Sequence, residues 1–235
     1  MKSDEALLHW LNNFPGRMTI LRFYRWSVPT VSFGKHQRVE GTLDKANYHR
    51  LGLDWVKRPT GGRAVLHDDD ELTYSVISSD SEFFGSGSIG DSYQLIARAL
   101  VDGLKRVGVT VQTASRKNVS SSRGHERERR SPCFLTTSRD EIIVGDRKLV
   151  GSAQHRLKRS FLQHGSIPLR INYSLMSAAL AVDTETLRQR MISVSEAAGR
   201  LVTFRTMIGA LKAGFEYRFE IQLRPNKSPE NLRFL

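Results

Sequence analysis

Residues 141–153, EIIVGDRKLVGSA, contain two strand-like segments, 141–144 and 147–153, joined by Gly145-Asp146. A two-residue loop of this composition closes tight antiparallel hairpins. A further strand-like segment follows over residues 161–169. The pattern therefore predicts an antiparallel sheet built outward from this hairpin, with Lys148 opposite Ile143.

Helices and more strands surround this sheet in the sequence. Apolar residues at helical spacing predict helices over 3–13, 43–51, 91–107, 174–180, 184–191 and 204–215. Alternating patterns predict strands over 18–26, 31–33, 53–57, 64–66 and 72–77, the last three side by side, and a final strand over 217–223. Because helices and strands do not alternate regularly, we expect an α+β fold with a mixed, largely antiparallel sheet packed with helices.

The length of 235 residues is ample for one hydrophobic core, and no internal repeat divides the chain. We expect a main core over residues 1–172. Residues 173–235 are expected to form a helical segment with the final strand, as part of the same domain.

Composition limits the class of protein. Hydrophobic residues make up 39% and charged residues 26%, as in ordinary soluble domains. The net charge of +12 favours acidic partners, which include nucleic acid, anionic lipid and acidic proteins. The most apolar stretch, 171–182, contains four polar residues, so we expect no membrane span. Two acids near the start and no apolar run after them favour a cytoplasmic location.

The loop Arg58-Pro59-Thr60-Gly61-Gly62-Arg63 is the first candidate binding element. Residues without side chains let backbone N–H groups approach an anion or an acyl carbonyl oxygen. A plain Pro-Gly turn with two solvated arginines explains the pattern equally well. His67, at the end of the next strand, is more often a structural histidine, and Asp68–Asp70 are more often solvated than metal-binding.

Cys133 is the second candidate, as the only cysteine of the chain. It cannot form an internal disulfide or a cysteine-rich zinc site, so no metal is expected. A thiol with an ordinary pKa of about 8.5 is only a few per cent ionised at neutral pH, and a nearby cation raises that fraction. The basic segment 116–130 precedes Cys133, and Lys148 lies on the return strand of the hairpin. A buried, inert cysteine and a surface lysine on an edge strand are the alternatives.

Small residues form the third candidate cluster. Ser152 and Ala153 end one predicted strand, and His164 and Gly165 lie within the next. Small side chains leave room for a ligand, although close strand packing gives the same pattern.

Together these segments resemble the biotin and lipoate protein ligase superfamily, in its LipM-type octanoyltransferase branch. The resemblance spans residues 4 to about 169 and rests on the motifs DEALL (4–8), LRFY (21–24), RPTGGRAVLHD (58–68), LTYSV (72–76), CF (133–134), RKLVGSAQ (147–154) and LQHGSI (162–167). It implies the α+β catalytic domain shared with class II aminoacyl-tRNA synthetases, with residues 1–172 as its core. It also implies transfer of an octanoyl group from acyl carrier protein to a lysine of a lipoyl domain.

By this resemblance, Cys133 matches the nucleophile that forms an acyl thioester, and Lys148 matches the lysine that activates it. The loop from Arg58 to His67, including Thr60, Gly61, Gly62 and Arg63, would line the acyl site with Ser152, Ala153, His164 and Gly165. No ATP or other cofactor is expected, because a thioester donor is already activated. Expected partners are octanoyl-acyl carrier protein and a lipoyl-domain protein such as glycine cleavage H protein.

Other functions stay open at this stage. The basic segment 116–130 has no interleaved aromatic residues, so nucleic acid is not an expected partner. We also expect no membrane partner and a monomeric protein. An ATP- and Mg²⁺-dependent lipoate ligase has the same fold and needs no cysteine; Arg63 in place of a third glycine, with Cys133-Phe134, favours the transferase. Octanoyl transfer between lipoyl domains and an inactive module that binds acidic carrier proteins are the remaining alternatives.

Overall fold

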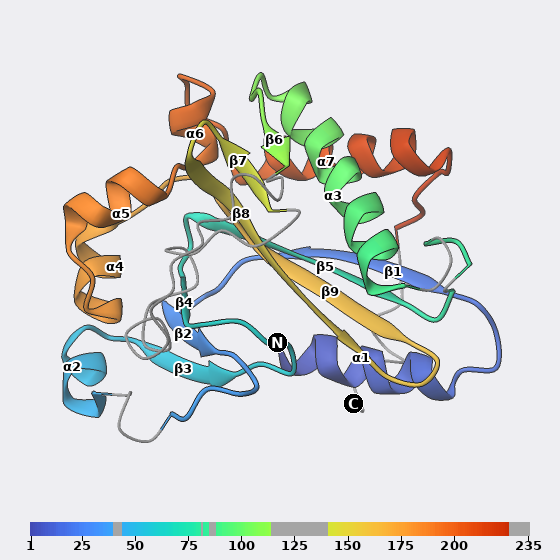
Figure 1. The fold of residues 1–235 in the computed structure, drawn as a ribbon, viewed down its shortest axis with the longest axis horizontal. Helices are drawn as coiled ribbons and strands as arrows, with labels where there is room; N and C mark the ends of the chain where they lie inside the picture. Colours follow the sequence, from blue (N-terminus) through green and yellow to red (C-terminus); the bar gives the residue numbers. More distant parts are fainter. Residues whose placement is uncertain (40–43, 81, 85–87, 114–140, 226–235) are drawn as a thin grey trace.

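The computed structural model describes residues 1–39, 44–80, 82–84, 88–113 and 141–225. Its main sheet has six strands in the order β1-β5-β9-β8-β7-β6, and every neighbouring pair is antiparallel (Figure 1). The strands are β1 (Thr19–Tyr24), β5 (Glu71–Ser78), β9 (Phe161–Pro168), β8 (Arg147–Arg156), β7 (Ile142–Val144) and β6 (Gln112–Thr113). The predicted α+β class with a largely antiparallel sheet is confirmed.

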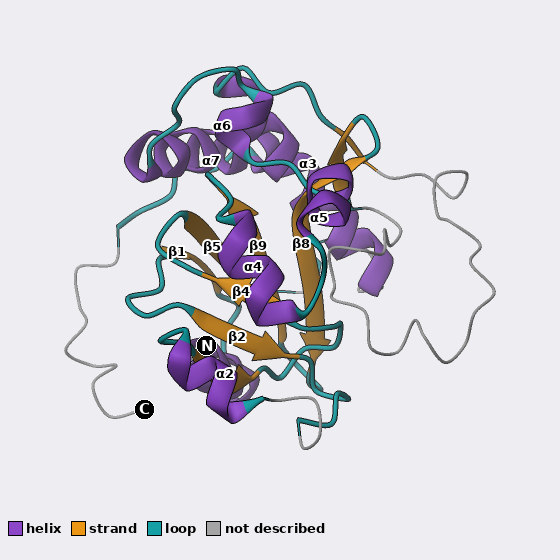
Figure 2. Ribbon diagram, turned by 90° about the vertical axis from the view of Figure 1, so that its left-hand side faces the viewer, coloured by secondary structure: helices purple, strands orange, loops and turns teal. Residues whose placement is uncertain are grey.

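A smaller sheet lies beside the main one, with β2 (Thr30–Phe33) between β3 (Asp54–Lys57) and β4 (Val65–His67). Strand β2 runs parallel to β3 and antiparallel to β4. The sheet shares an apolar cluster with α2 (Lys45–Arg50), α4 (Tyr173–Leu180) and α5 (Thr184–Arg190), and Figure 2 shows α4 in front of β2 and β4. The C-terminal third of the chain therefore covers a sheet formed by its first third.

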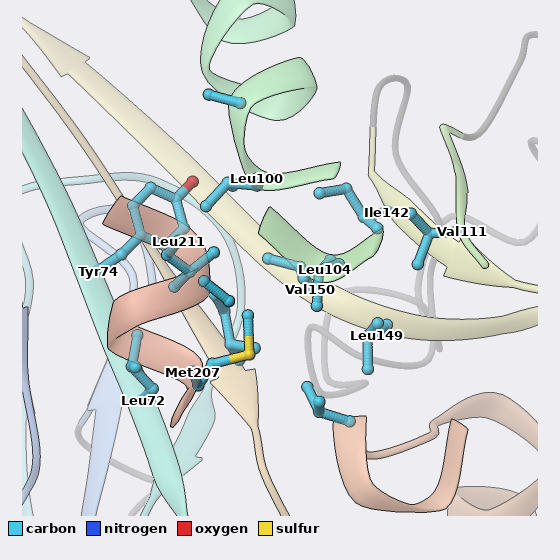
Figure 3. Packing of buried hydrophobic residues seen from close by; sticks show 14 of the residues in the cluster. Leu72, Tyr74, Leu100, Leu104, Val111, Ile142, Leu149, Val150, Met207 and Leu211 are labelled. Carbon is cyan, nitrogen blue, oxygen red and sulfur yellow. The ribbon is translucent and has the colours of Figure 1, made fainter. Parts of the chain in front are cut away.

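Two long helices cover one face of the main sheet. Helix α3 (Ile89–Arg106) packs against α7 (Phe204–Phe219), and both contribute to the largest apolar cluster (Figure 3). The helices approach closely because each has a glycine at the contact. A Cβ atom added to Gly214 would lie 2.5 Å from the Gly103 nitrogen, closer than real contacts allow.

Helix α1 (Lys2–Asn13) covers the opposite face of the main sheet. Its Leu7, Leu8 and Leu11 pack with Ile77, whereas the neighbouring residue Val76 belongs to the cluster beneath α3 and α7. Successive side chains of a strand point to opposite faces, so α1 and the pair α3 and α7 enclose the sheet between them.

The hairpin that anchors the prediction is present as expected. Gly145-Asp146 joins β7 to β8 with Val144 opposite Arg147 and Ile143 opposite Lys148, and Gly145 has a φ of 58°. The helices predicted over 3–13, 43–51, 174–180, 184–191 and 204–215 are confirmed, with ends that differ by up to four residues.

Two predictions about the elements are wrong. Residues 217–223 form no strand; Phe215 and Phe219, four residues apart, stack at 6.0 Å on α7, which continues to Phe219 and ends where Glu220 takes a φ of 52°. Strands β3, β4 and β5 are not side by side: β2 lies between β3 and β4, and β5 lies in the main sheet because the turn after His67 carries the chain into it. The helix predicted over 91–107 is confirmed as α3, which begins two residues earlier because Ser88 caps it.

Two short elements escaped prediction, β6 and α6 (Val194–Ala197), because each is too brief for a periodic pattern. In the part of the chain that the structure describes, no helix is both long and apolar enough to cross a membrane.

Candidate active site

The loop 58–63 is fastened by its own first residue. Arg58 is 5% exposed, and its guanidinium donates to the carbonyl oxygens of Gly61 at 2.9 Å and Arg63 at 2.7 Å. It also donates to the Ser32 carbonyl at 2.9 Å and the Ser32 hydroxyl at 3.0 Å. The alternative of a solvated arginine is therefore wrong for Arg58, which holds the loop against β2.

The same loop lies directly on the segment after β2. The Lys35 nitrogen donates to the Thr60 carbonyl at 2.8 Å, and a Cβ atom on Gly34 would lie 1.9 Å from the Gly62 carbonyl oxygen. Gly62 itself has a φ of 91°, which only glycine adopts without strain. Because Gly34 has no side chain and Gly62 can take a positive φ, the backbone of the loop packs directly against the backbone of Gly34.

Beneath this loop is a cavity between the two sheets. Its empty space, including part that is open to solvent, is about 400 Å³. The lining residues are Met1, Ser32, Arg58, Val65, His67, Thr73, Gly151, Ser152, Ala153, His164, Gly165 and Ser166. Six predicted substrate-binding residues therefore meet at one cavity, and they come from β4, β8, β9 and the loop after β3.

On one side of the cavity, His67 belongs to a buried hydrogen-bonded group. Its Nε2 lies 2.7 Å from the Ser32 hydroxyl and its Nδ1 lies 2.8 Å from a Glu71 carboxylate oxygen. Thr73 and Ser166 each donate to Glu71 at 2.5 Å. Sequence reasoning missed Ser32 and Glu71, because a serine and a glutamate at strand positions carry no local signal of burial.

On the other side, His164 reaches the glycine-rich loop. Its Nε2 lies 2.7 Å from the Thr60 hydroxyl, so Thr60 contributes to the site through this ring rather than by lining the cavity. Its Nδ1 is buried, lies 3.9 Å from an Asp4 oxygen and makes no hydrogen bond within the described residues. Burial lowers the pKa of His164, which keeps the ring neutral at neutral pH.

Asp4 stands behind His164 as a fully buried carboxylate of α1. It accepts hydrogen bonds from Arg22, from the Tyr24 hydroxyl at 2.6 Å and from the Ser75 hydroxyl at 2.9 Å. Burial raises the pKa of Asp4, but the nearby His164 ring, the Tyr24 hydrogen bond and the Arg22 charge together lower it to about 2. Asp4 therefore fixes α1 to the main sheet as a carboxylate.

Ser152 and Gly165 form the part of the cavity wall made by β8 and β9, where they are paired. The Ser152 hydroxyl lies 2.7 Å from the Tyr74 hydroxyl, and burial raises the pKa of Tyr74 to about 12. A Cβ atom on Gly165 would lie 2.5 Å from the Gly151 carbonyl oxygen and 2.6 Å from a Tyr74 ring carbon. The small residues therefore allow close packing of β8 and β9 and at the same time leave space for the cavity.

The polar residues of the cavity wall mostly bond to one another. The hydroxyl or ring atoms of Ser32, His67 and Thr73 are paired within the Glu71 group. Ser166 donates to Glu71, Ser152 pairs with Tyr74, and His164 pairs with Thr60. Carbon atoms are thus left facing the empty space, which suits an apolar chain.

Lys148 lies four positions before Ser152 on β8, about 13 Å along an extended strand. It is 1% exposed, and its ammonium nitrogen lies 2.5 Å from an oxygen of Glu141, which is 3% exposed. The alternative of a surface lysine on an edge strand is therefore wrong, because the Lys148 side chain is buried. Sequence reasoning missed Glu141, which stands directly before β7.

The remaining predicted residues differ in position. Gly61, Gly62 and Arg63 belong to the clamped loop and are not among the residues that line the cavity; Arg63 has one buried nitrogen without a hydrogen bond in the described part. Cys133 and the basic segment 116–130 lie outside the described residues. The described ranges contain no group of three or more side chains suited to hold a metal ion.

The architecture is that of the lipoate-protein ligases. Lipoate-protein ligase A bound with ATP superposes with a TM-score of 0.77 at 24% identity, covering 97% of this chain and 83% of that one. A putative lipoate protein ligase from T. acidophilum gives a TM-score of 0.76 at 25% identity, covering 97% and 82%. The expected fold is confirmed.

The family is equally clear from sequence. The family model of the lipoyl protein ligase A/B catalytic domain matches residues 1–216, and the chain belongs to this family. Among curated relatives, the octanoyltransferase LipM of Bacillus cereus is 37% identical over 98% of this chain and 85% of that protein. LipM of Moorella thermoacetica is 43% identical over 82% and 68%, and LipM of Bacillus subtilis 34% identical over 100% and 87%. The resemblance seen in the sequence motifs is therefore confirmed.

Proposed function

We propose that the protein is an octanoyltransferase of protein lipoylation, which moves an octanoyl group from acyl carrier protein to a lysine of a lipoyl domain. The observation that carries this proposal is the 34–37% identity to LipM octanoyltransferases over nearly the whole chain. The cavity supports it, because its carbon-lined wall suits an eight-carbon chain.

The proposed reaction has two halves, with Cys133 as nucleophile. In the first, the Cys133 thiolate attacks the carbonyl carbon of the donor thioester. A new carbon–sulfur bond forms, the bond to the carrier's sulfur breaks, and the carrier leaves as a thiolate that takes up a proton. In the second, the acceptor lysine amine attacks the Cys133 thioester, an amide forms, the amine loses a proton and the Cys133 thiolate is regenerated.

Lys148 and the loop 58–63 are proposed to assist both halves. The Lys148 ammonium would favour the thiolate form of Cys133 and polarise the acyl carbonyl, as positive charge does in general. Backbone N–H groups at the glycine-rich loop, such as that of Gly62, would donate to the oxyanion of each tetrahedral intermediate. Ser152, Ala153, His164 and Gly165 would contact the octanoyl chain, since they line the cavity.

The partners in this proposal are acidic as classes. A surface with a net charge of +12 attracts octanoyl-acyl carrier protein and the lipoyl domain at long range. We further propose that the protein works in the cytoplasm as a monomer and needs no cofactor, because the thioester donor supplies the activation.

Intact mass spectrometry after incubation with octanoyl-acyl carrier protein tests the proposal. Wild type should gain an adduct of about 126 Da, the mass of one octanoyl group in place of a hydrogen, and Cys133→Ala should gain none. Adding a lipoyl-domain protein should then move the adduct to the acceptor without ATP. An adduct that persists in Cys133→Ala would contradict the role of the cysteine.

A further arm of this experiment separates the transferase from a ligase. The distinction needs an assay because a solved lipoate-protein ligase has the same fold as this chain. A ligase would modify the lipoyl domain only with free octanoate or lipoate, ATP and Mg²⁺. Modification of the acceptor only in that arm would replace the proposed function with ligation.

A further inference from the structure

Four buried side chains connect the glycine-rich loop to the middle of the fold. Arg58, Ser32, His67 and Glu71, here called the Arg58–Glu71 chain, are each at most 5% exposed. They come from the loop after β3, from β2, from β4 and from β5. The chain thus spans both sheets.

Hydrogen bonding gives this chain one direction. A carboxylate only accepts, so the Glu71 oxygen at 2.8 Å requires a proton on His67 Nδ1. With a single ring proton, on Nδ1, the Nε2 atom accepts from the Ser32 hydroxyl at 2.7 Å. The Ser32 oxygen in turn accepts from the Arg58 guanidinium at 3.0 Å. Every link therefore donates toward Glu71.

Two further contacts fix Glu71 and His67. Thr73 donates to the same Glu71 oxygen as His67 at 2.5 Å and itself accepts from the Trp26 indole at 2.8 Å. The Trp26 ring also stacks on His67, with centroids 4.4 Å apart and planes inclined by 16°. The imidazole thus has neither a free rotation nor a free polar atom in this arrangement.

At its other end, the chain sets the direction of the loop amides. Arg58 holds the carbonyl oxygens of Gly61 and Arg63. In a trans peptide the carbonyl group and the next N–H group point in opposite directions, and the described residues contain no cis peptide. The N–H groups of Gly62 and Ala64 are therefore directed away from Arg58.

We propose that Glu71, His67 and Ser32 are positioning residues for acyl transfer, which hold Arg58 and through it the loop 58–63 with its amides aimed at the reacting oxygen. This inference rests on the proposed function. Positioning of this kind stabilises the transition state more than the bound substrate, so its loss lowers kcat more than it changes KM.

Kinetics of octanoyl transfer test the chain as a unit. Glu71→Gln and Ser32→Ala should each lower kcat about tenfold with KM for octanoyl-acyl carrier protein nearly unchanged, a fraction of the loss that follows removal of an oxyanion donor. The double variant should lose no more than the larger single loss, because both act through one chain. Asp70→Asn is the matched control: it pairs with Arg170 at the surface, and its kcat should equal that of wild type.

Three results would overturn the inference: wild-type kcat in Glu71→Gln, a change in KM alone, or a double variant whose loss is the product of the single losses. If Glu71→Gln does not fold, Ser32→Ala decides by its kcat alone. Folding of each variant is checked by thermal unfolding.

Nitrogen-15 NMR of the histidine rings tests the direction of the chain without substrate. The protein has seven histidines, and the signal that is lost in His67→Gln identifies the ring of His67. His67 should be protonated on Nδ1 and not on Nε2; the opposite tautomer would refute the chain. Because this measurement needs no acyl transfer, its failure is distinct from failure of the proposed function, which the Cys133 adduct reports.

Discussion

The Lys148 ammonium nitrogen lies 2.5 Å from Glu141 Oε1, and both side chains are almost completely buried. A buried ion pair of this kind is strongly destabilised when one partner is removed, since the other charge stays behind. Lys148 is thus both the proposed activating group and half of a structural pair, and variants at this position affect stability as well as activity.

Lys148→Ala should lower the free energy of unfolding by roughly 3–5 kcal/mol, because Glu141 loses its partner in a buried place. Adding Glu141→Gln to Lys148→Ala should recover part of that loss while leaving octanoyl transfer impaired. Urea unfolding and transfer assays measure the two effects separately. Arg147→Ala is the control on the same strand, since its partner Glu196 is 42% exposed, and it should cost less than about 1 kcal/mol.

Asp4 should make the protein sensitive to acid. Its pKa is lowered to about 2 in the folded protein from an ordinary value of 3.8, so its carboxylate contributes stability above pH 4. That contribution, on the order of 2 kcal/mol, is lost as the pH falls from about 4 to about 2. Asp4→Asn should be less stable than wild type at pH 7, and the gap should narrow towards pH 2. Equal acid dependence of the two proteins would refute this.

Asp68 should have the opposite effect on the pH dependence of stability. Burial and the nearby charge of Glu71 raise its pKa to about 6, so the folded state holds a proton that the unfolded state releases above pH 4. Stability is therefore lost as the pH rises from about 4 through 6. Asp68→Asn keeps the acceptor for the Asp70 nitrogen and should be more stable than wild type at pH 7 by about 1 kcal/mol, after allowance for solvent screening. Thermal unfolding at pH 4.5 and 7 checks whether the gain appears only at the higher pH.

Gly165→Ala should disturb the cavity wall. The added carbon would lie under 3.0 Å from Gly151, Tyr74 and Ser152, so we expect a loss of about 1–3 kcal/mol in stability and slower octanoyl transfer. Gly209→Ala is the matched control, because a carbon added at this position of α7 meets no described atom within 4 Å apart from the local backbone of its own helix. It should stabilise the protein by about 0.5–1 kcal/mol. If Gly165→Ala changes neither the stability nor the rate of octanoyl transfer, β8 and β9 can move apart at this position and the prediction is wrong.

The basic segment before Cys133 should guide the acidic donor. Reversing the charges of Arg127, Arg129 and Arg130 should raise KM for octanoyl-acyl carrier protein at low salt, because long-range attraction is lost, and have little effect at high salt. Steady-state kinetics at two ionic strengths measure this. The same salt dependence in variant and wild type would rule out docking at this segment.

Local chemistry explains what could be predicted from the sequence. The hairpin register follows from the two-residue loop at Gly145, which constrains only its neighbours. Glycine-rich and small-residue segments indicate the cavity residues from Arg58 to Gly165 as candidates, and the resemblance of their motifs to a known family gives them a shared site. Their convergence depends on pairings between distant strands, which no local pattern specifies.

Buried carboxylates were the main omission. Asp4, Glu71 and Glu141 look like ordinary surface acids in the sequence, since burial of a charge depends on partners far along the chain, such as Arg22 for Asp4. The final strand was wrong for a related reason: the apolar residues of 215–223 fit either period, and contact with Phe83 and Phe84 selects the helix.

The glycine contact between α3 and α7 has a consequence for how this chain can be divided. Gly214 lies well beyond residue 172, yet it packs against Ala99 and Gly103 of α3, and Met207, Leu211 and Phe215 complete the cluster on that face of the sheet. A fragment ending at residue 172 would leave Leu100 and Leu104 exposed to water. We expect such a fragment to aggregate, so the first 172 residues are not an autonomous folding unit.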